Sequence, residues 1–220
     1  MRNGRRQVRP ERSVRRERST AAAPPVVAVT GAARGVGHAL VTRLASSPRV
    51  GRVVAVDDHR GDAAGVTWRL ADVRDPTLAS RLAGVDVVVH TDVDTSADTD
   101  PRARRARNVR AAQTVLTAAA AERVGRVVLV TSAMVYGARP DNPVPLPEDA
   151  PLLADSADTL AGDLLEIEEL ARRARRSLGL LSAEVSTSVC TTTSTPFSRE
   201  ASVGSRTSAS RHVTPVASPR

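Results

Sequence analysis

Glycines with a spacing that suits phosphate binding lie near the start of the chain, in the segment Thr30–Gly37, which reads TGAARGVG. The segment follows a short Val-rich run and opens a stretch of helical periodicity, which is the context that a dinucleotide-binding loop needs. Glycines there let the backbone turn tightly and approach a pyrophosphate, whose negative charge is favoured at a helix N-terminus. The candidate loop residues are Gly31, Ala33, Arg34, Gly35, Val36 and Gly37.

A carboxylate supports the same interpretation, because Asp57 ends the second Val-rich run. At that position a carboxylate accepts hydrogen bonds from the adenosine ribose hydroxyls and repels a 2'-phosphate, which favours NAD over NADP. Arg34 and Arg60 favour the opposite choice, because a guanidinium pairs well with a 2'-phosphate. We therefore expect NAD as the cofactor, with NADP as the less favoured alternative.

Short Val-rich runs alternate with helical stretches through the middle of the chain, and this alternation predicts the elements that position the loop. The expected strands are Val26–Thr30, Arg52–Asp57, Val66–Leu70, Val85–His90 and Arg126–Thr131. The expected helices are Val36–Ala45, Pro76–Ala83, Pro101–Val124 and Asp158–Ser177. Such an order indicates a parallel sheet with right-handed crossovers. The predicted fold class is α/β, a Rossmann-type doubly wound parallel sheet with helices on both faces.

Composition divides the chain into three parts. Residues 1–25 are polar and Arg-rich, and we expect a disordered leader there. Residues 26–181 carry the strand and helix pattern of the nucleotide-binding domain. Residues 182–220 contain 17 Ser or Thr among 39 residues, which predicts a mostly disordered tail. Our hypothesis is that the reading frame shifts near Leu181; the alternative is a genuine low-complexity tail.

Charge and cysteine content limit the partners and the compartment. The net charge is +8, but the first 20 residues carry eight Arg against two Glu, so most of the basicity belongs to the leader. A solvated tail is favoured over a nucleic-acid-binding arm or an organellar transit peptide. No apolar run reaches the ~20 residues of a membrane span, and we expect a soluble, cytoplasmic protein. The lone Cys190 excludes an internal disulfide and a thiolate metal cluster, and we expect no metal site.

Several further segments resemble the short-chain dehydrogenase/reductase superfamily, and most closely its extended branch of NAD-dependent epimerases and dehydratases that act on nucleotide sugars. Beyond the glycine loop, they are Ala71-Asp72-Val73, the Val85–His90 run, Asn108-Val109 and the Val130–Gly137 segment. The resemblance covers Val26 to about Leu181 and identifies the chain as an atypical member, truncated at its C-terminus. It implies that homodimer formation through the long helices is possible.

The resemblance also implies roles for individual residues. Asp72 and Val73 would flank the adenine, although Asp72 could instead cap the helix that follows. Thr91 would border the cofactor at the end of the fourth strand, and Asn108 would stabilise the sheet near the ribose. Asn108 could equally be a solvent-facing helix residue.

The family's catalytic constellation is incomplete in this sequence. In the family, a Ser or Thr after the fifth strand works with a Tyr and a Lys four residues apart, and Ser132 matches the first of these. The chain has no Lys, and its only Tyr, Tyr136, belongs to the Val-Tyr-Gly segment. Leu160 and Leu164 occupy the two other places, and neither can transfer a proton. Ser132 is the one candidate catalytic residue, and its hydroxyl could instead satisfy nearby backbone groups.

Other side chains with possible chemistry give weaker signals. His59, His90 and Asp163 are conceivable substitutes for the missing acid-base groups, although no spacing favours any of them. Trp68 is expected in the core. A cluster of arginines in the third predicted helix is interpreted as a solvated face rather than a nucleic-acid patch: Arg102, Arg104, Arg105, Arg107 and Arg110.

Three functions are compatible with these observations. The first is an NAD-dependent enzyme that acts on nucleotide sugars, or a descendant of one; the small-molecule substrate is unknown, because the family's substrate region is not legible. The second is a catalytically silent dinucleotide-binding regulatory module, which needs only the loop and Asp57. The third is a non-functional fragment of an oxidoreductase.

Overall fold

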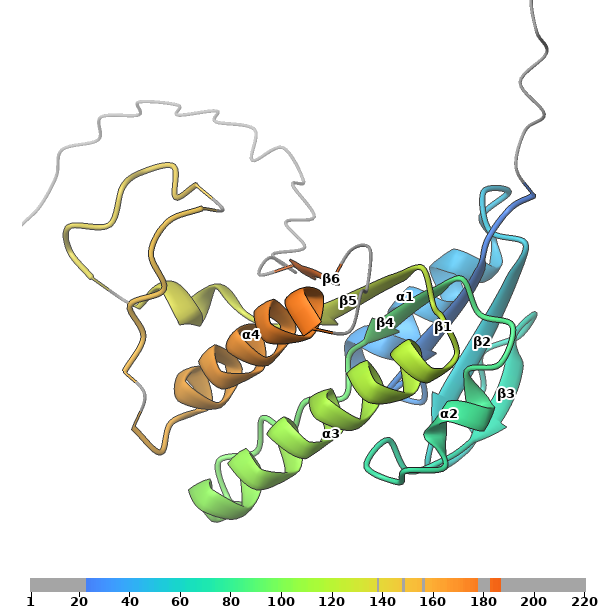
Figure 1. Ribbon diagram of the computed structural model, residues 1–220, viewed down its shortest axis with the longest axis horizontal. Helices are drawn as coiled ribbons and strands as arrows, with labels where there is room; N and C mark the ends of the chain where they lie inside the picture. Colours follow the sequence, from blue (N-terminus) through green and yellow to red (C-terminus); the bar gives the residue numbers. More distant parts are fainter. Residues whose placement is uncertain (1–22, 138, 148, 156, 178–182, 187–220) are drawn as a thin grey trace, which may run out of the picture. The chain divides into compact units, whose positions relative to one another are not determined.

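Six parallel strands form a single sheet in the computed structural model, which describes residues 23–137, 139–147, 149–155, 157–177 and 183–186 (Figure 1). The strands are β1 (Val26–Thr30), β2 (Arg52–Asp57), β3 (Thr67–Leu70), β4 (Val87–His90), β5 (Arg126–Val130) and β6 (Ala183–Ser186). Their order in the sheet is β3-β2-β1-β4-β5-β6. The strand order reverses between β1 and β4, so a crevice opens at the carboxyl ends of these two strands.

Helices cover the sheet on both faces. They are α1 (Gly35–Ala45), α2 (Leu78–Arg81), α3 (Pro101–Ala121) and α4 (Leu160–Ser177), with a short 3-10 helix η1 (Ala133–Tyr136) after β5. In Figure 1, α3 and α4 lie side by side on one face and α1 lies behind the sheet. Among these helices, none is long and apolar enough to cross a membrane.

The core is divided by the sheet into two layers, because successive strand residues point to opposite faces. Ala28, Val54 and Val88 point to the α3 and α4 side, where Leu116 and Ile167 complete a large apolar cluster. On the other side, a smaller cluster brings α1 against β1 and β2: Val27, Val29, Ala32, Val41, Val53 and Ala55. The central strands β1 and β2 are therefore buried on both faces, as is usual in a parallel sheet.

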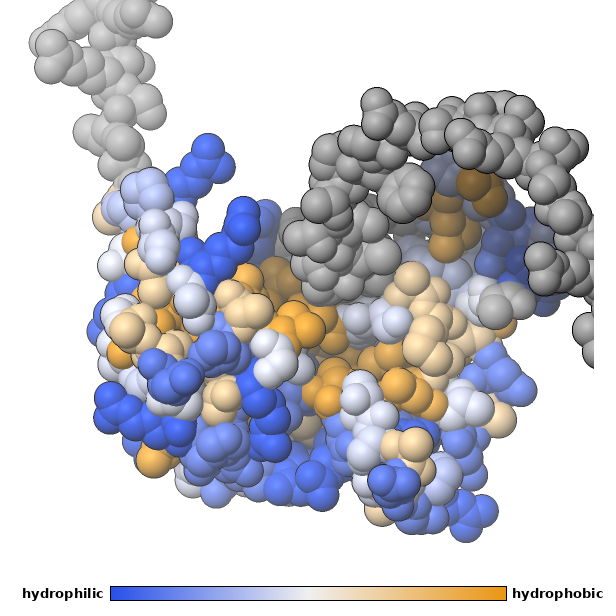
Figure 2. Space-filling view, turned by 180° about the vertical axis from the view of Figure 1, so that it is seen from behind, coloured by the Kyte–Doolittle hydropathy of each residue, from blue (hydrophilic) through white to orange (hydrophobic). Residues whose placement is uncertain are grey.

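The face that carries α1 is less completely covered beside β4 and β5. Val87 and Val89 of β4 and Val128 and Val130 of β5 alternate with buried residues and are themselves only partly buried. Figure 2 views the molecule from behind and shows hydrophobic side chains gathered between hydrophilic margins.

The predicted fold class and the five predicted strands are confirmed, with ends that differ by at most two residues. The predicted helix Pro76–Ala83 is only one turn, Leu78–Arg81, because the Asp75 carboxylate accepts the Thr77 amide and forms a turn ahead of it. The sheet continues beyond the expected boundary at Leu181, since β6 pairs with β5 from Ala183. Residues 1–22 and 187–220, where we expected disorder, lie outside the described part of the chain.

The prediction of a solvated arginine face on α3 is wrong for Arg104. Its side chain is 8% exposed, and its Nε donates to the fully buried carboxylate of Asp163 on α4 at 2.8 Å. Arg105 reaches Glu166 of α4 at 2.8 Å. Arg104 and Arg105 of α3 therefore pair with acidic residues on α4. The sequence separation of about sixty residues hid this pairing.

We predict that Asp163→Ala lowers the free energy of unfolding by about 3 kcal/mol, because it leaves the buried Arg104 guanidinium without its partner. Urea unfolding of both proteins measures the loss. Asp158→Ala is the matched control, since Asp158 pairs with Arg102 on the exposed surface at 3.6 Å and its removal costs at most about 1 kcal/mol. Equal losses in the two variants would contradict a buried role for Asp163.

Candidate functional site

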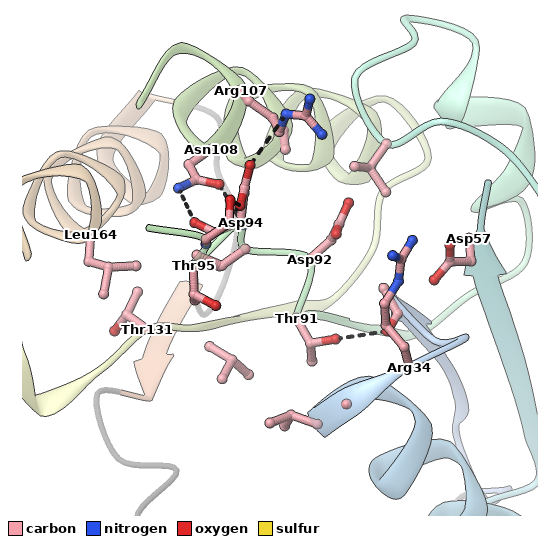
Figure 3. A pocket seen from close by; sticks show the side chains of 18 of the residues that line it. Arg34, Asp57, Thr91, Asp92, Asp94, Thr95, Arg107, Asn108, Thr131 and Leu164 are labelled. Atoms are coloured by element: carbon pink, nitrogen blue, oxygen red, sulfur yellow. Dashed lines mark hydrogen bonds and ion pairs between the residues drawn. The ribbon is translucent and has the colours of Figure 1, made fainter. Parts of the chain in front are cut away.

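A cavity of about 780 Å³ opens at the carboxyl ends of the central strands, where the strand order reverses (Figure 3). The glycine loop and the start of α1 form one wall, and the loops after β2, β3 and β4 form others. The remaining lining comes from α3, from the segment after β5 and from the first turns of α4. Topology thus brings residues from positions 31 to 164 around one space.

Each glycine of the loop serves a different purpose. Gly31 has a φ of +75°, and a Cβ on it would lie 2.8 Å from the Asp92 backbone nitrogen. Gly35 has a φ of +54° and faces open space, since no atom lies within 4 Å of the place of a Cβ. A Cβ on Gly37 would overlap the Gly31 carbonyl oxygen and would lie 2.5 Å from the Thr91 hydroxyl. Gly37 therefore allows α1 to pack directly against the loop.

The N-terminus of α1 points at the cavity without a side-chain cap. Arg34 is the N-cap residue in extended conformation, its side chain makes no capping hydrogen bond, and the first turn holds no acidic residue. Free amide groups and the helix dipole make such an end a site for an anion. The open space beside Gly35 lies at the same end of the helix.

Asp57 holds the glycine loop as well as lining the cavity. Its carboxylate is 6% exposed, and Oδ2 accepts the Ala33 amide at 2.9 Å while Oδ1 accepts the Asp58 amide at 2.9 Å. Ala33 contributes this amide and does not itself line the cavity. The hydrogen bond joins the end of β2 to the loop after β1, so the predicted ribose-binding carboxylate also has a positioning role.

Asp58 adds a second carboxylate at the same edge, which the sequence analysis did not single out. The His59 Nδ1 lies 2.5 Å from Asp58 Oδ1, and the Arg34 guanidinium lies 3.7 Å away. The hydrogen bond with His59 holds the pKa of Asp58 below its usual value. Asp57, Asp58 and His59 bring one ligand atom each within 4.8 Å of one another, and their mutual hydrogen bonds account for this arrangement.

The resemblance-based candidates of the next two strands lie around the same cavity. Asp72 binds the Arg74 guanidinium through both oxygens, at 2.8 and 2.6 Å, and this hydrogen bonding lowers the pKa of Asp72. Asp72 does not cap the following helix, whose N-cap is Thr77. Val73 is 4% exposed beside it. The Thr91 hydroxyl donates to the Thr30 carbonyl at 2.7 Å.

Asn108 is buried, which rules out a solvent-facing position on α3. Its Oδ1 accepts the Asp94 amide at 2.8 Å, and its Nδ2 donates to the Asp94 carbonyl at 3.0 Å and to Asp163 at 3.3 Å. The side chain therefore fixes the loop after β4 rather than a strand of the sheet. The expectation that Asn108 stabilises the sheet is corrected accordingly, because its hydrogen bonds are with a loop and α4.

The part of the cavity lined by α4 is apolar at the two places where the resemblance led us to look for Tyr and Lys. Leu160 and Leu164 both line the cavity, one helical turn apart. Ser132 lines it as well, and its Oγ accepts the Met134 amide at 3.3 Å as the N-cap of η1. Tyr136 is 4% exposed within the core cluster and is absent from the lining. Ser132 therefore has no acid-base partner from the Tyr and Lys positions.

The substitutes considered for the missing groups do not line this cavity. His90 is buried with its Nδ1 2.7 Å from the Thr30 hydroxyl, and burial lowers the pKa of His90 to about 4. Asp163 is held by Arg104, and His59 by the carboxylates beside it. A different buried acid, Glu168, accepts the hydroxyl of the cavity residue Thr131 at 2.8 Å, and burial raises the pKa of Glu168.

Two acidic residues after β4 also line the cavity, and the sequence had not predicted either of them as a site residue. Asp92 lies beside Gly31, and Asp94 lies 3.7 Å from the Arg107 guanidinium (Figure 3). The rule that ligands bind at the carboxyl ends of parallel strands pointed to this loop. Nothing in the local pattern distinguished these two aspartates from others in the acidic stretch after His90.

A parallel sheet in the order 3-2-1-4-5-6, with a glycine loop at its switch point, defines a Rossmann-type nucleotide-binding protein. The sequence model of the NAD dependent epimerase/dehydratase family matches residues 27–177. The chain therefore belongs to this family, and the resemblance drawn from the motifs is confirmed.

Several known proteins are similar to this chain. An uncharacterised protein of Mycobacterium bovis is 36% identical over 163 residues, which cover 68% of this chain and 43% of that protein. A short-chain dehydrogenase/reductase superfamily protein from Agrobacterium tumefaciens with bound NAD is 31% identical, with a TM-score of 0.60 over 73% of this chain and 47% of that one. A dTDP-glucose 4,6-dehydratase double mutant from Streptomyces venezuelae with NAD bound is 28% identical, with a TM-score of 0.60 over 72% and 53% of the two chains. The chain thus spans less than half the length of the curated relatives it matches.

We predict that Gly37→Val lowers the free energy of unfolding by about 2–3 kcal/mol, because a branched side chain cannot fit against Gly31 and Thr91. Gly35→Ala is the control in the same loop, since it adds a methyl group in open space and costs about 1 kcal/mol for the positive φ alone. Urea unfolding of the three proteins measures both losses. A Gly37 variant no weaker than the Gly35 variant would show that close packing of α1 is not required.

We predict that His90 makes stability fall as the pH is lowered. An unfolded His binds a proton near pH 6.5, but buried His90 binds one only near pH 4, so the unfolded state holds more protons between these values. Stability is thus lost as the pH falls from about 6.5 to about 4, by roughly 3 kcal/mol in all. His90→Asn keeps a polar atom for Thr30 and should flatten this part of the curve in urea unfolding at several pH values. Parallel curves for the two proteins would rule out His90 as the source.

Proposed function

We propose that this domain binds NAD and holds it without carrying out the proton transfer typical of its family. The feature that carries the proposal is the cavity itself, which joins an uncapped helix N-terminus and an open glycine loop to an apolar corner at Leu160 and Leu164. The residues present fit a dinucleotide. Gly35 leaves open space at the start of α1, and the amide groups of that uncapped helix end can bind a phosphate there. Family membership supports a nicotinamide dinucleotide as the ligand.

Charge at the end of β2 supports NAD over NADP. Asp57 and Asp58 both line the cavity there, and two carboxylates repel a 2'-phosphate. Arg34 could have reversed this preference, but its guanidinium lies 3.7 Å from Asp58 and is partly neutralised by it. Arg60, the other cation considered, is not among the cavity residues.

The chain's own groups explain why binding need not lead to reaction. A bound nicotinamide supplies hydride exchange, but the family reaction also needs a group that moves a proton at the substrate oxygen. The resemblance assigns that work to a Tyr assisted by a Lys, and leucines stand in both places. Ser132 remains, with its hydroxyl accepting a backbone amide. Glu168 accepts a hydrogen bond from the cavity residue Thr131, but Glu168 does not line the cavity itself.

A second candidate function is an enzyme acting on nucleotide sugars. Solved structures that resemble this chain support it, including MoeE5 in complex with UDP-glucose and NAD, which is 29% identical with a TM-score of 0.59. This chain covers 51% of that protein, so about half of that protein has no counterpart in the match. The activity would then require residues outside the matched half.

We predict saturable binding of NADH and weaker binding of NADPH, measured by nicotinamide fluorescence during titration of the purified full-length chain. The carboxylates Asp57 and Asp58 are the reason for the difference. Addition of UDP-glucose to the NAD complex should leave the nicotinamide absorbance unchanged, because Leu160 and Leu164 supply no proton-transfer group. Turnover would favour the enzyme, and a lack of saturable binding would leave only the non-functional fragment.

A further inference from the structure

Three arginines, which we call the arginine triad, lie beside the edge strand β3: Arg52 at the start of β2, Arg69 in β3 and Arg81 at the end of α2. Figure 1 shows β3 at the margin of the sheet with α2 next to it. The Arg69 guanidinium reaches the segment that ends α2, where its Nη1 donates to the Arg81 carbonyl at 2.6 Å and to the Ala83 carbonyl at 3.1 Å. None of the three arginines lines the cavity at the carboxyl ends of the strands.

Strand alternation places Arg52 and Arg69 on the same face of the sheet. The residues next to them in the chain, Val53 and Trp68, belong to the apolar cluster beneath α1. Successive strand residues point to opposite faces, so Arg52 and Arg69 project toward α2 and α3. The hydrogen bond from Arg69 to the Arg81 carbonyl brings the third arginine to the same place. The fold therefore gathers cations from three separate elements.

The positive charges of the triad are not neutralised within the described part of the chain. None of the three guanidinium groups forms an ion pair with a carboxylate there, and the hydrogen bonds of Arg69 are with carbonyl groups. Burial lowers the pKa of Arg69, and the charges of Arg52 and Arg81 lower it further. By contrast, Arg74 and Arg104 each have an aspartate partner. A group of unpaired cations held together in this way attracts an anion from outside the chain.

The Arg-rich leader joins the folded domain beside the triad. The Pro25 carbonyl accepts the Gly51 amide at 2.9 Å, and Val26 pairs with Arg52 in the register of β1 and β2. The first 20 residues carry eight Arg against two Glu. Composition alone favoured a solvated tail, but its attachment next to Arg52 adds a second source of guanidinium groups that is tethered to the triad.

We propose that the arginine triad binds the phosphate backbone of duplex DNA, and that the leader adds further phosphate contacts. This binding goes beyond the proposed function and does not depend on a bound dinucleotide. Guanidinium groups suit phosphates because they remain charged and donate several hydrogen bonds in a fixed fork. Phosphate contacts carry no sequence information, so the affinity should be the same for duplexes of unrelated sequence.

The surroundings of the triad favour a nucleic acid over an anionic membrane. Helices that lie on membranes combine basic side chains with exposed apolar ones that enter the bilayer. Most large hydrophobic residues that are exposed in the described part of the chain follow β1 or β5: Val36, Met134, Val144 and Leu153. The remaining one, Leu70, follows Arg69 in β3 and therefore points to the opposite face. The triad thus offers charge without an apolar anchor on its own face.

Fluorescence anisotropy of a labelled DNA duplex, titrated with the purified full-length chain, tests the proposal. The wild-type protein should bind at low salt, and the logarithm of its association constant should fall linearly with the logarithm of the salt concentration. The double variant Arg52→Gln/Arg81→Gln should bind about tenfold more weakly and should reduce the steepness of this line by about 2. Both replaced side chains are exposed, so the variant is expected to fold.

The double variant Arg102→Gln/Arg139→Gln is the matched control. It removes the same charge from two exposed arginines that follow the carboxyl ends of β4 and β5, and it should keep the wild-type affinity and salt dependence. Circular dichroism checks that each protein is folded. If the triad variant does not fold, Arg81→Gln alone replaces it and should reduce the steepness by about 1.

Four results would overturn the proposal. The first is a wild-type protein that does not bind DNA at low salt. The second is unchanged DNA binding in the folded triad variant, which would mean that the leader binds by itself. The third is an equal loss in the control variant, which would mean that only net charge matters. The fourth is cosedimentation with phosphatidylglycerol vesicles without any binding of DNA, which would identify a membrane surface instead.

Discussion

The close contact of Gly37 with the Gly31 carbonyl and the Thr91 hydroxyl is the constraint on which the rest of this site depends. It joins the end of β1, the start of α1 and the end of β4 in one place, with no room for a side chain. Because α1 packs so closely, its uncapped N-terminus faces the cavity. Asp57 then ties the loop to β2 through the Ala33 amide. The backbone packing at Gly37 by itself therefore creates an anion site at the N-terminus of α1.

The side of the cavity formed by α3 and α4 contributes packing and a buried ion pair rather than a group that transfers protons. Leu160 and Leu164 present apolar surface to it, whereas the neighbouring Asp163 turns away to a buried ion pair with Arg104. A buried pair of this kind is costly to break and gains little over apolar packing. Through Asn108, the same cluster holds the loop that follows β4. The α3–α4 contact therefore fixes the shape of the cavity without contributing acid-base chemistry to it.

Several acidic residues surround a cavity that is expected to bind a dianionic pyrophosphate. Most of these carboxylates have a cationic or backbone partner, which reduces their repulsion of the phosphates. Arg34 and His59 lie beside Asp58, Arg74 holds Asp72, and backbone amides hold Asp57. Asp92 adds a further carboxylate to the cavity beside Gly31. In the proposed function, the amides and the dipole at the N-terminus of α1 bind the phosphates of the dinucleotide.

The sequence alone determined the class of fold, because Val-rich strands, helical spacing and the TGAARGVG turn are local patterns with local causes. Together with the family resemblance, it also predicted leucines, Leu160 and Leu164, at the places of the reactive Tyr and Lys, since this is a matter of residue identity. Tertiary structure decided which charges meet: Arg104 is buried against Asp163, and Asp92 is left unpaired beside Gly31 among the described residues. These residues are about sixty positions apart in the chain, and only the packing of α4 on α3 and of β4 beside β1 brings them together.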